Sequence, residues 1–416
     1  MKLAIGLASI AVFSWSLIVS EPEDWEIVIG GNTLGYLSPC GCAKPMKGGI
    51  RRRIAATVHL AEGRKLLSLD TGNLASGVGR QDEIKAESLA EAFRLGKIDA
   101  INLGGRDADL GLPMVEAINR LSGDRLISSN LVGGAISLRS RVVKGPFVVA
   151  GTSPDGAMIG ARLGVASLPT DDVVVDLLEF ARTNKKLPIL MTQGGEDHAR
   201  ELAKKHSKLF MIVYQSETQP RREPLIVGKT WIVSPGMKGQ ALISMRVKGD
   251  RLEDYRVVEL GPTWENDAGA EKIYRRYVQR VSDENLIEEL PRLEGPEFAG
   301  TAACATCHSA SADVWKMSAH AAALKTLERE GHDRDPECIS CHVVGMQSVM
   351  GFRTRTTTPD LANVGCESCH GAGRQHATSP MQISMPKSGV ESCLPCHVPE
   401  HSPEFDFDEY WKLIQH

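Results

Sequence analysis

Four copies of one short motif, Cys-x-x-Cys-His, constrain this chain more than any other feature. All four lie after residue 300 of the 416 residues and together hold eight of the ten cysteines. The motif residues are Cys304, Cys307, His308, Cys338, Cys341, His342, Cys366, Cys369, His370, Cys393, Cys396 and His397. Two thiols at this spacing can form thioethers with both vinyl groups of a haem, and the following histidine can bind the iron. The sequence therefore predicts four covalently bound haem c groups with His308, His342, His370 and His397 as proximal ligands.

Paired cysteines also occur in zinc sites and in redox-active dithiols, and these alternatives fit less well. Zinc in a ribbon takes four thiolates and does not require a histidine directly after every pair. A thioredoxin-like dithiol has no such requirement either. The repeated histidine favours haem at all four motifs.

The sixth ligand of each iron determines whether a haem only transfers electrons or also binds small molecules. A second histidine closes the site, whereas an open position permits ligand binding. Five histidines outside the motifs lie in the same region: His320, His332, His376, His401 and His416. They are more numerous than four sites need.

The region from about Phe298 to His416 resembles the cytochrome c554 family of tetrahaem proteins. The resemblance lies in the four motifs, in Trp315 with Ser318-Ala319-His320-Ala321, and in Gly365–Gly371 with His376. It implies closely packed, mostly bis-histidine haems and an electron carrier, with one five-coordinate haem. By this resemblance His320, His376 and His416 are the candidate distal ligands and the haem on His342 is the open one. His332 and His401 remain alternatives.

Two functions follow from this arrangement. The first is electron transfer between redox partners through four haems that lie close enough to exchange electrons. The second is a haem enzyme in which one open iron acts on a small nitrogen or sulfur compound. Electron transfer requires fewer assumptions, and whether the chain is an enzyme stays undecided at this level.

The amino terminus has the pattern of an export signal. Met1-Lys2 precedes the apolar run Leu3–Val19, and the acidic stretch Glu21–Asp24 follows. The sequence therefore predicts a signal peptide over residues 1–20 and a periplasmic or otherwise extracytoplasmic location. Ile18 is a poor residue before a cleavage site, so an uncleaved anchor that holds the chain at the membrane is the alternative.

Residues 25–262 predict a layered α/β domain, because short apolar runs alternate with amphipathic stretches. With 42% hydrophobic and 24% charged residues, the composition is that of a globular protein. The expected strands are 25–29, 65–69, 100–103, 125–128, 147–150, 188–191, 209–213, 229–233, 241–247 and 255–260. Helical spacing occurs over 82–95 and 196–206. A charged helical connector over 263–297 leads to a mainly α, loop-rich haem domain over 298–416.

The layout of the α/β domain resembles the 5′-nucleotidase branch of the calcineurin-like metallophosphatases. The matching segments are Ile29–Gly35, Gly48–Arg52, Leu69–Asn73, Leu103–Asp107, Thr192–Gly195 and Val213–Glu217. Such enzymes bind two metal ions through Asp, His and Asn side chains, and the two ions together hold the oxygens of the scissile phosphate ester. At these positions the chain has Asn32, Leu34, Asn73, Arg106 and Gln193 instead. We therefore expect the fold without its dinuclear chemistry, and no phosphoesterase activity.

Two features of the α/β domain are left open by the sequence. Cys40 and Cys42 lie one residue apart in a loop with Gly and Pro, too close for an unstrained disulfide with each other. Metal binding, redox function, a disulfide with a partner or no role would each fit. The basic run from Lys44 to Arg53 predicts either contacts with haem propionates or another anion, or a solvated face.

The charge balance indicates which partners to expect. A net charge of −4 gives no support for nucleic-acid binding. From residue 301 onward the chain has nine Lys and Arg against fourteen Asp and Glu, and haem propionates would add negative charge. We therefore expect redox partner proteins with a basic docking surface.

Overall fold

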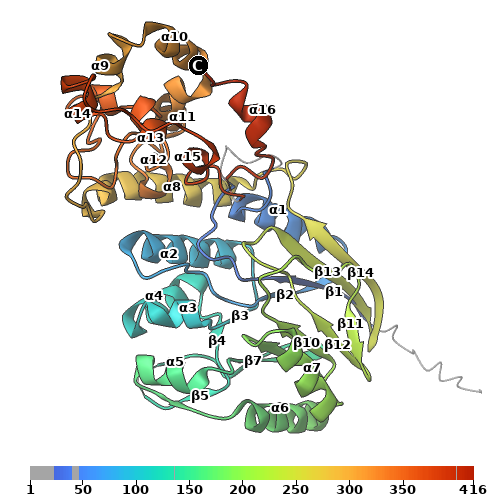
Figure 1. Cartoon of the computed structure of the whole chain (residues 1–416). Helices are drawn as coiled ribbons and strands as arrows, with labels where there is room; N and C mark the ends of the chain where they lie inside the picture. Colours follow the sequence, from blue (N-terminus) through green and yellow to red (C-terminus); the bar gives the residue numbers. More distant parts are fainter. Residues whose placement is uncertain (1–22, 40–45, 135, 400) are drawn as a thin grey trace, which may run out of the picture.

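The computed structural model describes residues 23–39, 46–134, 136–399 and 401–416. The predicted signal segment, Cys40 and Cys42 lie outside the described residues. An α/β sandwich forms the first part of the described chain, and short helices with long loops form the last part (Figure 1). This architecture confirms the fold class expected from the sequence.

The first sheet has six strands in the order β14-β13-β1-β2-β3-β4. Its strands are β1 (Asp24–Gly30), β2 (Lys65–Asp70), β3 (Ala100–Asn102), β4 (Leu126–Ile127), β13 (Ala241–Lys248) and β14 (Arg251–Glu259). Strands β1 to β4 are parallel, and β13 and β14 join them antiparallel. The carboxyl ends of four strands therefore meet at one edge of this sheet.

The second sheet also has six strands, in the order β11-β12-β10-β9-β7-β6. They are β6 (Arg141–Lys144), β7 (Phe147–Thr152), β9 (Leu187–Thr192), β10 (Met211–Tyr214), β11 (Leu225–Val227) and β12 (Thr230–Val233). Strands β7, β9, β10 and β12 are parallel. A small antiparallel pair, β5 (Leu131–Val132) and β8 (Ala166–Ser167), completes the strands described.

The two sheets pack face to face and share one apolar core. Ile27 and Leu67 of the first sheet lie in the same buried cluster as Phe147, Ile189 and Met211 of the second. Strand β7, Phe-Val-Val-Ala-Gly-Thr, is buried at every position because its other face is covered by helices. Parallel strands covered on both faces have such continuous apolar sequences.

Helices cover both outer faces of the sandwich. The helices of this part are α1 (Ile50–Leu60), α2 (Arg80–Leu95), α3 (Gly105–Asp109), α4 (Leu112–Ser122), α5 (Gly156–Leu163), α6 (Thr170–Asn184) and α7 (Glu196–Lys205). Helices α2 and α4 share a buried cluster on the first sheet, and α6 and α7 share one on the second. All ten segments predicted as strands overlap a strand of the structure.

Helix α8 (Ala268–Asp283) joins the two parts of the chain. The Asp267 side chain caps it by accepting a hydrogen bond from the Ala270 amide at 2.8 Å. One face of the helix, with Ile273, Tyr274 and Tyr277, is buried in the cluster that includes α2. Figure 1 shows α8 between α2 and the C-terminal helices. The helix therefore packs with the sandwich and also supports the C-terminal part.

The C-terminal part consists of short helical turns. They are η1 (Leu286–Glu289), α9 (Thr301–Ala305), α10 (Ser309–Met317), η2 (Ala319–Ala322), α11 (Ala323–Glu330), α12 (Pro336–Ile339), η3 (Pro359–Leu361), α13 (Cys366–His370), α14 (Arg374–Thr378), α15 (Val390–Cys393) and α16 (Phe407–Trp411). Its small apolar core includes Ile339, Val344 and Phe352. Among the described residues from 374 to 416 no side chain is buried, so the polypeptide alone builds little interior there.

The helices of both parts are short or carry many charges. Within the described ranges, every helix is too short or too polar to span a bilayer.

Candidate functional site

Each of the four motifs begins in a short helix of its own. Cys304 lies in α9, Cys338 in α12, and Cys393 ends α15, while the third motif fills α13. The amide of His308 donates to the Cys304 carbonyl at 3.0 Å, and the amide of His397 donates to that of Cys393 at 2.9 Å. Residues four apart lie on the same face of a helix. The first cysteine and the histidine of these motifs therefore face the same way.

The thiols of different motifs approach one another. A hydrogen bond from Cys304 lowers the pKa of the Cys366 thiol to about 6, against the opposing effect of burial. A hydrogen bond with Cys396 lowers the pKa of Cys341 to about 6 in the same way. The first motif thus lies beside the third, and the second beside the fourth. A lowered pKa favours the thiolate, which is the reactive form of cysteine.

Three of the four motif histidines face a second histidine. The ring centres of His308 and His376 are 6.2 Å apart, those of His320 and His397 are 6.3 Å apart, and those of His370 and His416 are 5.9 Å apart. An imidazole nitrogen bonds a first-row metal at about 2 Å, and the ring centre lies about 1 Å behind it, so two rings on one metal have centres roughly 6 Å apart. All three pairs have this spacing.

Hydrogen bonds to three of these rings leave one nitrogen of each available. Nδ1 of His376 lies 2.5 Å from the Ile383 carbonyl, and Nδ1 of His416 lies 2.9 Å from that of Ile414. Nδ1 of His370 is 3.1 Å from the Pro386 carbonyl. A carbonyl oxygen only accepts, so Nδ1 carries the proton and the lone pair of Nε2 is free to bind a metal.

Burial favours the neutral form of the pair His320 and His397. Burial, followed by the nearby His397, lowers the pKa of His320, and burial lowers that of His397. A neutral imidazole is the form that binds metal. The spacing of the three pairs, the tautomers of His376, His416 and His370, and the lowered pKa values of His320 and His397 fit bis-histidine haem irons.

His342 of the second motif is arranged differently. Its Nδ1 lies 2.7 Å from the Ala323 carbonyl, which again leaves Nε2 available. The three histidine pairs described above do not include His342. His401, an alternative distal residue predicted from the sequence, lies close enough for its charge to affect Cys341 of this motif.

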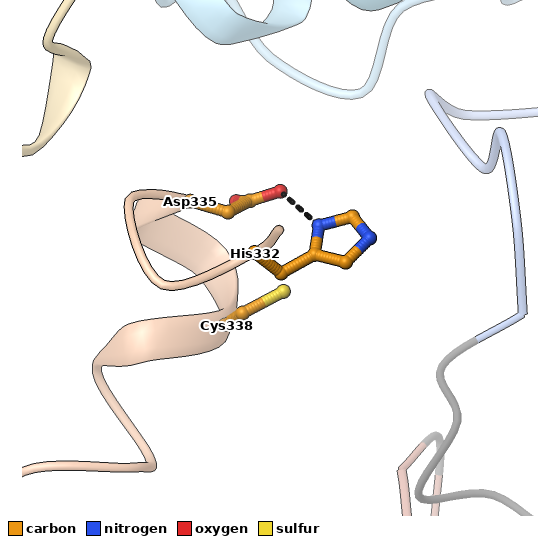
Figure 2. Close-up of side chains that lie close together, drawn as sticks. All are labelled: His332, Asp335 and Cys338. Carbon is orange, nitrogen blue, oxygen red and sulfur yellow. Dashed lines mark ion pairs between the residues drawn. The ribbon is translucent and has the colours of Figure 1, made fainter. Parts of the chain in front are cut away.

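His332, the other alternative distal residue, points toward the sandwich. Its Nε2 is 2.8 Å from the hydroxyl of Tyr274 in α8, and its Nδ1 is 3.6 Å from a carboxylate oxygen of Asp335 (Figure 2). The His332 ring therefore forms a hydrogen bond at the boundary with the α/β part. Sequence reasoning missed this contact, because Tyr274 and His332 belong to segments predicted separately.

The strand ends of the sandwich hold an amide network where the related fold has metal ligands. Asn32, after β1, accepts from Gln215 Nε2 at 2.5 Å and from Asn73 Nδ2 at 3.4 Å. Its own amide donates to the Ser216 carbonyl at 3.1 Å, and Gln193 donates to the Thr71 carbonyl. Neutral amides thus bond to one another across the two sheets.

The other residues of these loops, Arg106, Asp107 and Leu34, either form contacts within the protein or offer no ligand atom. Arg106 is exposed and its guanidinium donates to the Ser76 carbonyl at 3.2 Å. Asp107 is buried, which raises its pKa to about 6, and it accepts hydrogen bonds from the amides of Asn73, Leu74, Ala75 and Gly104. Leu34 has an apolar side chain and a left-handed backbone, φ 50°. Asp107 therefore orders a loop in this structure.

The basic run of the sequence is only partly exposed. Arg53 is buried and pairs with Asp70 at 2.5 Å, with 2% and 0% of their side chains exposed. Arg51 pairs with Glu271 of α8 at 2.7 Å and lies over the Tyr274 ring. The prediction of a solvated basic face is wrong for these two residues, because the carboxylates that they meet come from β2 and α8.

Comparisons with known proteins found separate relatives for the C-terminal part and for the α/β part. Residues 303–371 match the family described as cytochrome c554 and c-prime. The cytochrome c-554 of Nitrosomonas europaea is 36% identical over 109 residues, which are 23% of this chain and 44% of that protein. The chain thus spans less than half the length of this curated relative.

Solved structures resemble the α/β part. The sulfate thiohydrolase SoxB of Thermus thermophilus has a TM-score of 0.53 at 17% identity, over 63% of this chain and 61% of that chain. A 5′-nucleotidase precursor from the same species has a TM-score of 0.54 at 18% identity, over 67% and 63%. The NAD nucleotidase of Haemophilus influenzae has 0.53 at 12%, over 68% and 64%.

These likenesses confirm both resemblances noted in the sequence. The C-terminal part is related to cytochromes c554, and the first part has the 5′-nucleotidase fold. Because fewer than a fifth of the residues are identical, the structural likeness concerns the fold alone.

Proposed function

We propose that this protein is an extracytoplasmic c-type cytochrome that passes electrons between redox partners through four covalently bound haems. The three histidine pairs carry this proposal, because each combines a motif histidine with a distant histidine at the spacing of two ligands on one iron. The relation of residues 303–371 to cytochromes c554 supports haem c as the cofactor.

The residues assign one haem to each motif. Cys304 and Cys307 would bind the first, with His308 and His376 as ligands. Cys338 and Cys341 would bind the second with His342. Cys366 and Cys369 would bind the third with His370 and His416, and Cys393 and Cys396 the fourth with His397 and His320. When bound, haem c supplies an iron that accepts and releases one electron.

The chain's own residues orient these ligands. The Ile383, Ile414 and Pro386 carbonyls fix the rings of His376, His416 and His370 through Nδ1. Such contacts to ligating histidines set ring orientation and ligand basicity. Two histidines per iron leave no position for a substrate, which favours electron transfer over catalysis at these three motifs.

One observation favours a second candidate function at the second motif. The three histidine pairs do not include His342, whose Nδ1 lies 2.7 Å from the Ala323 carbonyl. An iron with an open position there would bind a small nitrogen or sulfur compound, and the protein would then be a haem enzyme. We regard this as the alternative to the carrier function.

Haem attachment is tested by mass. The mature protein, purified from a host with a cytochrome c maturation system, should be red and should carry the mass of four haems under denaturing conditions. A variant with Cys304→Ala and Cys307→Ala should carry three. A colourless protein, or one with the mass of the bare polypeptide, would refute the proposal.

Spin state separates the two functions. Electron paramagnetic resonance of the oxidised protein should show mainly low-spin haem and at most one high-spin centre. Two or more high-spin haems that bind added ligands, together with turnover, would overturn the carrier function in favour of the enzyme.

The α/β part would then act as a docking or scaffold module. Its amide network has neither the carboxylates nor the imidazoles that hold two metal ions. Hydrolysis of nucleotides in the presence of divalent metals would contradict this assignment.

A further inference from the structure

The C-terminal part contacts the sandwich through the segment just before the second motif. Gly331 lies against Val278 of α8, and Lys85 of α2 pairs with Glu337 of α12. Tyr274 of α8 bonds to His332 at 2.8 Å. These three contacts all lie within twelve residues of the second motif's histidine, His342. The α/β part therefore holds the second motif in place.

At the centre of this contact is the buried carboxylate of Asp335, 6% exposed. One oxygen accepts from Gln81 Nε2 of α2 at 2.8 Å and from the Glu337 amide at 3.0 Å. The other accepts from the hydroxyl of Tyr277 of α8 at 3.5 Å. Gln81 of α2 and Tyr277 of α8 thus donate hydrogen bonds to a carboxylate of the C-terminal part.

Asp335 also lies beside a cysteine of the motif. Ligand atoms of His332, Asp335 and Cys338 are all within 4.8 Å of one another, and Figure 2 shows the three side chains converging, with the ion pair between Asp335 and His332. Asp335 caps the helical turn α12 that carries Cys338. Its position is therefore fixed relative to the attachment point of the second haem.

The surroundings keep this carboxylate charged. Burial alone would raise the pKa of Asp335, but the nearby His332, the hydrogen bond from Gln81 and the charge of Lys85 outweigh it, and the pKa is lowered. Burial also raises the pKa of Tyr277, which keeps its hydroxyl protonated as a donor. A fixed negative charge, partly screened by donors from α2 and α8, therefore lies at the edge of the second haem site.

We propose that Asp335 is a positioning residue for the haem on Cys338, Cys341 and His342, and that α2 and α8 tune its reduction potential by hydrogen-bonding this carboxylate. The inference rests on haem attachment at the second motif, as proposed above. A negative charge next to a haem stabilises the oxidised form, and donors to that charge reduce its effect. The α/β fold, having lost its metal ligands, would thus serve as a regulator of one redox centre.

A metal site made of His332, Asp335 and Cys338 is the competing interpretation. Cys338 would then be a thiolate ligand and could not form a thioether. The Asp335 oxygens, however, already accept from Gln81, Tyr277 and an amide, which favours a carboxylate solvated by protein donors.

The test compares two variants whose effects should have opposite signs. Asp335→Asn keeps the shape and capping ability of the side chain but removes the charge. The midpoint potential of the second haem should shift upward, with the reduction equilibrium changing roughly tenfold for one partly screened charge. Gln81→Leu removes a donor and leaves the charge less screened, so the same potential should shift downward.

The measurement is a potentiometric titration of the full-length protein, with the haems resolved by electron paramagnetic resonance. Gln279→Leu is the matched control, because Gln279 lies exposed on α8 and bonds to Asp283. It should shift no haem, and the other three haems should be unaffected in all variants. Unchanged potentials, or shifts of the same sign in both variants, would overturn the proposal, since simple loosening of the contact acts in one direction.

Intact mass and metal analysis of the wild-type protein separate the causes of failure. Loss of haem at all motifs would refute the proposed function. Three haems together with one equivalent of zinc would refute this inference and reduce the proposed cytochrome to three haems, with the metal site in place of the second haem. Four haems and no additional metal are required for the tuning role.

Discussion

Replacing His376 by leucine gives the most direct test of the ligand assignment. The ring centre of His376 lies 6.2 Å from that of His308, and its Nδ1 is bonded to the Ile383 carbonyl. Leucine fills a similar volume but offers no ligand. We expect the first iron to lose its sixth ligand while its thioethers and His308 remain.

The size of the effect follows from the histidine pairs. If each pair binds one iron and the haem on His342 is open, as proposed, the oxidised protein has three low-spin haems and one high-spin haem. Removing one pair leaves two of each, so the high-spin signal should double and the low-spin signal should fall by one third. Quantified electron paramagnetic resonance spectra of the oxidised protein measure both changes. Haem content by mass should stay at four.

Two controls and a rescue sharpen this experiment. His332→Gln should leave the spin composition unchanged, because this ring is bonded to Tyr274 and faces Asp335. His59→Gln, on the exposed side of α1, should also have no effect. Imidazole added to the His376→Leu protein should restore the lost low-spin signal. An unchanged spectrum for His376→Leu, or a new high-spin haem in His332→Gln, would refute the assignment.

Three further predictions concern the two parts of the chain. Asp70→Asn should destabilise the α/β part by about 3–5 kcal/mol in urea unfolding, because it leaves the Arg53 charge buried, and adding Arg53→Met should recover most of the loss. Limited proteolysis of the chain made without haem should cleave first within residues 374–416, where no described side chain is buried; equal protection of both parts would contradict this. The rate of electron transfer to a basic partner should fall as salt rises, given nine Lys and Arg against fourteen Asp and Glu from residue 301; a rate independent of salt would exclude such docking.

The strands of the α/β part could be predicted because their signal is local. Residues 147–150 form a continuous apolar run, and the structure contains a strand at Phe147–Thr152 that is buried on both faces. Short edge strands such as β6 and β11 were missed, since few of their residues are buried. Burial at a sheet edge depends on neighbours that the sequence does not identify.

The four Cys-x-x-Cys-His motifs could be recognised for the same reason, but the pairing of the histidines could not. Cys304, Cys307 and His308 lie within five residues, so spacing alone indicates their chemistry. His376 comes close to His308 only because the third motif lies beside the first, which Cys304 and Cys366 show through their hydrogen bond. Such a contact is made by tertiary packing and leaves no periodic pattern.

Buried charged residues were the hardest to interpret. Arg53 belongs to a basic run, and only the position of Asp70 at the end of β2 shows that it is buried in an ion pair. Asp335 likewise has the sequence context of an ordinary acidic residue before a motif. Its role depends on Gln81 and Tyr277, which lie far away in the sequence.

The amide network at the strand ends provides a last test, which asks whether neutral amides are needed at these two positions. Asn32 and Asn73 bond to each other at 3.4 Å, and Asn32 is buried. Replacing both by aspartate would bring two carboxylates together without a cation, at a cost of about 2 kcal/mol or more in this partly buried position. We expect the double variant to unfold at lower urea concentration than the wild type in EDTA, and to regain stability when Mn²⁺ is added, because a divalent ion would neutralise the pair. The matched variant, with both residues replaced by glutamine, should respond to neither treatment. If the aspartate variant were as stable as the wild type in EDTA, the amides would not be replacing a charged site, and the loss of metal ligands would have to be explained by a different arrangement of these loops.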